Sequence, residues 1–138
     1  MVRAEATLAI PSLGIDVPIE LGSQAVIDAG VAAHYEAPGW LPPTAAGAPG
    51  TFWLAAHHVT HGGPFLRLPA IHVGAAVVIT TPTGQRYVYV VTSLQIVGTT
   101  ASYATVYGTK PSARLILLQT CFGAANRLFV HGVLTQTR

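Results

Sequence analysis

Two residue types in the C-terminal part of the chain could do chemistry together. The only cysteine, Cys121, ends the apolar run "LILLQTC", and Arg127 opens the next apolar run, "RLFV". A single cysteine excludes an intrachain disulfide. Four interpretations of Cys121 remain open: an intermolecular disulfide, a buried apolar thiol, a metal ligand, or a nucleophile with the arginine beside it.

The spacing of these two residues predicts where they lie. Arg114–Cys121 and Arg127–Leu134 have the composition of strands, and residues 122–126 are a suitable hairpin loop. Directly opposed residues of such a pair share one face, with Cβ atoms about 4.5–5.5 Å apart. Because no Asp or Glu follows Glu36, no carboxylate nearby in the sequence competes for the arginine. We therefore expect the thiol and the guanidinium to meet at one end of a sheet.

Histidines form the second cluster, in "TFWLAAHHVTHGGPF", with His57, His58 and His61. The i, i+4 spacing of His57 and His61 suits a zinc site only on a helix, and the Glu of HExxH is absent. A nucleophilic Cys121 needs just one of these imidazoles, to take the thiol proton and later protonate a leaving amine. Arg127 stays charged and cannot move protons, but it can donate hydrogen bonds to an oxyanion. His34, His72 and His131 are expected to be structural.

The elements that must position these residues are expected to be strands. The chain has 138 residues, of which 51% are hydrophobic and 9% charged, and 14 Gly and 10 Pro punctuate it. This favours a single folded domain, residues 1–138, of all-β class, as a closed barrel or a sandwich. "TPTGQR" predicts a hairpin turn, residues 24–35 a short helix, and residues 62–71 a helical turn ended by Pro69. The predicted strands are Thr7–Ile10, Ile15–Ile19, Thr51–His57, Ala76–Thr81, Gln85–Val91, Ser93–Val97, Arg114–Cys121 and Arg127–Leu134.

Charge and hydropathy exclude other classes. A net charge of +2 without a Lys/Arg cluster argues against a nucleic-acid partner. No apolar run approaches the roughly 20 residues that span a bilayer, and the N-terminus lacks the central apolar segment of a signal peptide.

Three motifs in this order resemble the sortase family. "LLQTC" is similar to the family's T-L-x-T-C, with Leu117 in place of the first Thr. "AHHVTHGGPFLRL" is similar to its G-H motif and the following P-F-x-x-L, with Ala56 in place of Gly and His58 where Arg is common. "LAIPSLGIDVPI" is similar to the first barrel strands, so the resemblance covers nearly the whole chain.

The resemblance implies a closed eight-stranded sortase-type β-barrel with one or two short helices. It also implies that Cys121 is the nucleophile, that His57 is the catalytic histidine, and that Arg127 stabilises the oxyanion and positions the substrate. Thr120, Ala56 and His61 match substrate-binding positions. The loop resembles class E and related actinobacterial sortases, in which a Tyr associated with LAxTG rather than LPxTG signals aligns with His61.

The implied activity is a transpeptidase without a cofactor. It would cleave a C-terminal sorting signal on a secreted protein, hold a Cys thioester, and transfer the protein to an amine on a peptidoglycan precursor or a pilin lysine. We expect a monomer on the extracellular face of a Gram-positive cell membrane, with the N-terminal membrane anchor absent from this chain. The remaining alternatives are a non-catalytic β-barrel binding module with a buried Cys121 and a cysteine peptidase that only hydrolyses.

The late absence of carboxylates supports two further expectations. No acid is available to orient His57, in contrast to a catalytic triad, so we expect a poorly activated thiol and a slow enzyme. Acidic loop residues that would bind calcium in some sortases are also missing after Glu36, so we expect no calcium site.

Overall fold

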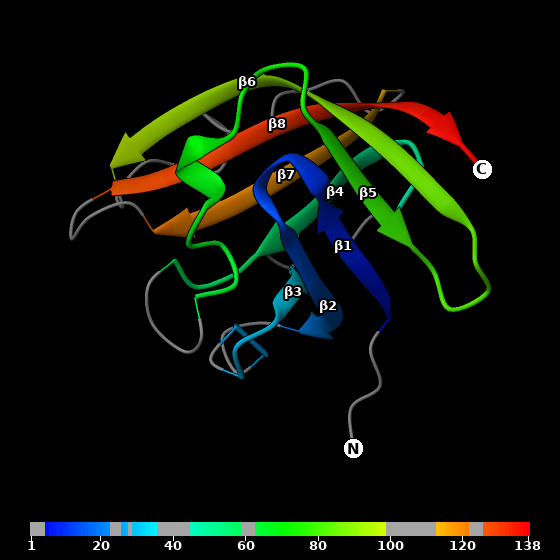
Figure 1. Cartoon of the computed structure of the whole chain (residues 1–138), viewed down its shortest axis with the longest axis horizontal. Coiled ribbons are helices and arrows are strands. Elements are labelled where there is room, and N and C mark those ends of the chain that lie inside the picture. Colours follow the sequence, from blue (N-terminus) through cyan, green and yellow to red (C-terminus); the bar gives the residue numbers. More distant parts are fainter. Residues whose placement is uncertain are drawn as a thin grey trace.

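The barrel is built from eight strands. A computed structural model describes residues 5–22, 26–27, 29–35, 45–58, 63–98, 113–121 and 126–138. The strands close into one barrel in the order β1-β2-β3-β4-β7-β8-β6-β5, which confirms the predicted all-β class and barrel (Figure 1). Their bounds are β1 Ala6–Ile10, β2 Ile15–Gly22, β3 Ala32–Tyr35, β4 Gly50–Ala55, β5 Ala76–Thr80, β6 Arg86–Gly98, β7 Arg114–Cys121 and β8 Asn126–Thr137. Two 3-10 helices are also described, η1 Pro11–Leu13 and η2 Leu68–Ala70.

Most neighbouring strands are antiparallel, but two pairs are parallel. β2 pairs with β3 and β4 pairs with β7 in parallel, the latter from Gly50↔Arg114 to Ala55↔Gln119. β7 then pairs antiparallel with β8, and the long curved strands β6 and β8 lie side by side (Figure 1). β7 is therefore flanked by a strand from the middle of the chain and by its own hairpin partner.

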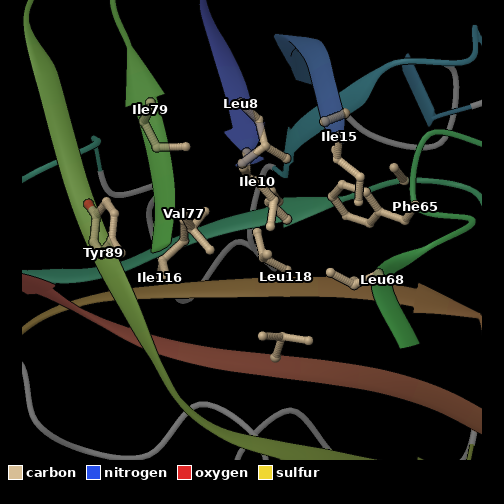
Figure 2. Packing of buried hydrophobic residues seen from close by; sticks show 14 of the residues in the cluster. Leu8, Ile10, Ile15, Phe65, Leu68, Val77, Ile79, Tyr89, Ile116 and Leu118 are labelled. Carbon is tan, nitrogen blue, oxygen red and sulfur yellow. The ribbon is translucent and has the colours of Figure 1, made fainter. Parts of the chain in front are cut away.

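The inside of the barrel is filled by apolar side chains. Side chains from β1, β5, β6 and β7 point towards one another, among them Leu8, Ile79, Tyr89 and Leu118 (Figure 2). Phe65, from the connection after β4, packs into the same cluster and is fully buried. Strand alternation explains this arrangement, because every second residue of a strand faces one side of the sheet. Phe65 anchors the β4–β5 connection, which begins at the histidine cluster, to the core.

β3 was not predicted. The segment from 24 to 35 was expected to hold a short helix; Val26 and Ile27 are helical, but Ala32–Tyr35 forms a strand. Ala32 and Ala33 are fully buried, and pairing with both β2 and β4 overrides the weak local preference of alanine for strands.

The two strands predicted over residues 85–97 are one, β6. The register against β8 shifts between Val91 and Ser93, so Thr92 is an extra residue, as in a β-bulge. The bulge breaks the alternation of the sequence, which is why the pattern suggested two strands.

In the β4–β5 connection, Pro69 lies within η2 and does not end it, because proline suits the first turn of a helix. The predicted hairpin turn between β5 and β6 is confirmed.

Candidate active site

Cys121 and Arg127 are directly opposed. They form the last pair of the β7–β8 ladder, Cys121↔Arg127, as the hairpin predicted. Cys121 is exposed and Arg127 is half-buried. Exposure of the thiol excludes the interpretation of Cys121 as a buried core residue. Within the described residues the salt bridge joins His34 to Glu5, with 2.6 Å between Nδ1 and Oε1, and no carboxylate there pairs with Arg127.

His57 reaches the same edge from the other side of β7. The parallel β4–β7 register ends at Ala55↔Gln119, and two hydrogen bonds extend it by one residue. The Ala56 N–H donates to the Gln119 carbonyl at 3.2 Å, and the Ala56 carbonyl accepts from Thr120 Oγ1 at 2.8 Å. His57 and Cys121 are the next residues of the two strands, so continuing the register brings them side by side. We call His57, Cys121 and Arg127 the rim row.

The rim row lies on the outer face of the sheet. Ala56, Thr120 and Leu128 are buried, and Ala56 and Leu128 belong to the core inside the barrel. Residues one position away point to the opposite side, so His57, Cys121 and Arg127 face outwards. Ala56 and Thr120 thus lie beneath the rim row and bond to each other. Their expected role in binding substrate stays a prediction.

The two adjacent histidines differ in their surroundings. The His57 carbonyl accepts a hydrogen bond from the Phe65 N–H at 3.1 Å, which fixes the backbone where the chain turns back into the core. The His58 ring lies beside this returning chain, with Nε2 3.1 Å from the Leu66 carbonyl oxygen. This arrangement favours His57, on the outer face, as the partner of Cys121. The substrate-binding prediction for His61 lies outside the described residues.

A glycine lets the returning segment approach the first hairpin closely. Gly14 has φ +66°, and a Cβ there would lie 3.1 Å from Arg67 Nη1. The same Nη1 donates to the Leu13 carbonyl at 3.2 Å. A shallow surface pocket at this junction is lined by Arg67, His58 and Ser12, among others, and by no member of the rim row. The contact ties the segment after His57 to the β1–β2 turn.

Below the rim row, the outer face carries an apolar cluster with one polar contact. Trp53, Leu117 and Phe129 are buried there, and Val97 packs against them. The Trp53 indole Nε1–H donates to Gln119 Oε1 at 2.9 Å. Gln119 was not among the predicted site residues, although strand alternation already puts it on the face of Cys121, two residues away.

Further along this face, a histidine lies beside a glutamine. His131 Nε2 is 3.0 Å from Gln95 Oε1, and burial lowers the pKa of His131 below its usual 6.5. The described residues contain no group of three or more His, Cys, Asp or Glu able to hold a metal ion. In the same part of the chain, no helix is long and apolar enough to cross a membrane.

Comparisons with known proteins agree with this geometry. The family model "Sortase domain" matches residues 8–135. Sortase SrtE1 of Streptomyces coelicolor is 31% identical over 96% of the chain. A crystal structure of sortase E1 from Streptomyces coelicolor, with a tripeptide in the active site, superposes with a TM-score of 0.85 at 29% identity, covering 99% of this chain and 90% of that one. Sortase E from Streptomyces avermitilis gives a TM-score of 0.83 at 26% identity, with the same coverage. The chain spans 41% of the length of the curated relative.

Proposed function

Because the chain belongs to the sortase family, whose members are cysteine transpeptidases, we propose that its rim row performs transpeptidation. The observation that carries the proposal is the arrangement around β7. An exposed thiol ends the strand, a guanidinium is directly opposed to it, and an imidazole follows the neighbouring strand. These three groups supply a nucleophile, an oxyanion donor and a proton carrier.

The first half-reaction forms a thioester. His57 accepts the Cys121 proton, and Sγ attacks the carbonyl carbon of the scissile peptide bond. Arg127 donates hydrogen bonds to the oxygen that becomes negative in the tetrahedral intermediate. The intermediate collapses when the C–N bond breaks, and the imidazolium of His57 protonates the departing amine. The acyl group remains on sulfur.

The second half-reaction transfers the acyl group. A neutral acceptor amine attacks the thioester carbonyl, and Arg127 again stabilises the oxyanion. The C–S bond breaks as the new amide forms, and the proton released by the amine returns through His57 to the sulfur. The enzyme is restored, and water in place of the amine would give hydrolysis instead.

The substrate we propose is a C-terminal sorting signal of the LPxTG or LAxTG type on a secreted protein. The acceptor would be an amine of a peptidoglycan precursor or a pilin lysine, and the reaction would occur at the surface of a Gram-positive cell. The likeness to sortase E supports the class, and the tripeptide in the active site of the Streptomyces coelicolor protein supports a peptide substrate. Among the described residues, the acidic side chains are Glu5, directly before β1, and Asp16 and Glu20 in β2. This supports the expectation of a slow enzyme that lacks an acid at His57.

The test is a paired peptide assay. LPxTG and LAxTG peptides are incubated with the chain, with and without a primary-amine acceptor, and the products are identified by mass. We expect cleavage between Thr and Gly and a ligated product when the acceptor is present. Cleavage without ligation at saturating acceptor would favour a hydrolase. Failure to cleave or to form a Cys121 adduct with either peptide would refute the proposal.

A further inference from the structure

Gln119 is placed to meet a peptide held at Cys121. The two residues are separated by one position in β7 and share the outer face, so their Cα atoms are about 6.6 Å apart at the rise of a strand. An extended peptide advances by a similar distance in two residues. Gln119 therefore lies level with a substrate group about two residues from the scissile carbonyl, if the peptide runs along β7.

The orientation of the Gln119 amide follows from its partner. The Trp53 indole N–H can only donate, so the atom 2.9 Å from it must be the oxygen of the amide. The two N–H bonds of Nε2 then point away from Trp53. Trp53 itself is only 2% exposed, so its indole N–H cannot turn to bond with water instead of Gln119. The contact fixes the amide with its donors turned away from the apolar cluster.

Among the described residues, the Gln119 Nε2–H groups donate to no partner. Within the described part of the chain, Gln119 makes this one side-chain hydrogen bond and is only half-buried. Its paired neighbours are Ala55 on β4 and Phe129 on β8, whose side chains offer no acceptor. Because the Gln119 amide is already fixed and its neighbours are apolar, it needs little reorganisation when an acceptor binds. Such preorganisation is the condition for a useful binding contact.

We propose that Gln119 is a substrate-binding residue, whose Nε2 donates to a backbone carbonyl about two residues before the scissile bond. This rests on the function proposed above. The backbone carbonyl is present whichever residue occupies that position. The contact therefore orients the peptide strand and does not choose between LPxTG and LAxTG signals.

Two substitutions separate this role from a structural one. Gln119→Met has a similar length but offers Trp53 only a weak sulfur acceptor and donates nothing to substrate. Gln119→Glu keeps an oxygen for Trp53 and loses the donors. We expect each to lower kcat/KM for peptide cleavage about tenfold, the size of one lost hydrogen bond in a water-poor site. Thermal melting reports folding, and the rate of Cys121 alkylation by iodoacetamide reports any effect of the new carboxylate on the thiol.

The deciding measurement changes the substrate carbonyl. Peptides carrying a thioamide, a weaker acceptor, at the second or third residue before the scissile bond are compared with their oxoamide counterparts. We expect one of these thioamides to lower wild-type kcat/KM about fivefold, and to have no such effect on Gln119→Met. A penalty that is equal in both enzymes at both positions would overturn the inference while leaving the proposed function standing. A wild-type chain that cleaves no sorting peptide at all would refute the proposed function itself.

Discussion

The two faces of the β4–β7–β8 sheet divide structure from chemistry. The inner face carries Leu54, Leu118 and Val130, all buried in the barrel core. The outer face carries Cys121 and Arg127 at the rim. Because strand residues alternate between faces, the inner positions pack in the core, whereas the outer positions at the rim are not needed for packing, although Trp53, Leu117 and Phe129 still pack together further along the outer face. Substitutions at the outer rim should therefore mainly lower activity, and substitutions on the inner face should mainly lower the free energy of unfolding.

The largest effect is expected on the outer face, for Cys121→Ala. Loss of the nucleophile should lower peptide cleavage more than about a thousandfold, with no acyl-enzyme detectable by mass. The thiol is exposed, so the melting temperature should stay near that of the wild type. A variant that kept its activity would assign the chemistry to another residue.

The inner-face counterpart is Leu118→Ala, three residues earlier on the same strand. Leu118 is fully buried, and its truncation should lower the free energy of unfolding by about 3 kcal/mol. Denaturant unfolding measures this. The folded fraction should keep most of its cleavage activity, and a large loss of activity without loss of stability would break the division between the faces.

Arg127→Lys tests whether shape as well as charge matters at the rim. Lysine keeps the positive charge but loses the planar set of donors. We expect kcat for cleavage to fall about a hundredfold, the usual size for an oxyanion donor. Wild-type kcat in this variant would indicate that Arg127 does not contact the oxyanion.

Thr120→Val changes a buried residue directly beneath the rim row. Its Oγ1 donates to the buried Ala56 carbonyl at 2.8 Å. Valine has the same shape without the donor, so we expect a loss of about 1–2 kcal/mol of unfolding free energy. Cleavage should also fall a few-fold, since the bond joins the strands that carry His57 and Cys121. Thr120→Ser, which restores the donor, should recover most of both.

The smallest effect concerns His131, on the outer face away from the rim. Burial lowers its folded-state pKa below 6.5, so the unfolded chain binds the proton more readily. Its contribution to stability is therefore complete above pH 6.5 and is lost as the pH falls from 6.5 through the lower folded-state pKa. Unfolding free energies of wild type and His131→Gln, measured from pH 8 to 5, should converge towards low pH. Curves that stay parallel would show that His131 does not titrate in this way.

The parts of the fold that depend on strand alternation and on turns could be predicted from the sequence. The β7–β8 hairpin and the Cys121↔Arg127 pair followed from two apolar runs and the loop between them. β3 was not predicted because Ala32 and Ala33 have little intrinsic preference for strands. The strand is stabilised instead by its pairing with β2 and β4. β6 was divided because the extra residue at Thr92 changes the phase of its pattern.

The residues of the candidate site could be predicted from the sequence, but the hydrogen bonds that position them could not. His57, Cys121 and Arg127 were named from residue types and from the family resemblance. The bonds from Ala56 to Gln119 and Thr120, and the Trp53–Gln119 contact, depend on the parallel pairing of β4 with β7. No local pattern encodes that pairing, because the two strands are far apart in the chain.

That pairing has a consequence for when a functional molecule first exists. The Ala56–Thr120 bond joins residues 64 positions apart, and closing so long a loop is a slow step in folding. A chain that has emerged only as far as β6 contains His57 but not the thiol of Cys121. The proposed reactivity towards peptides would therefore require that the C-terminal strands have joined the sheet.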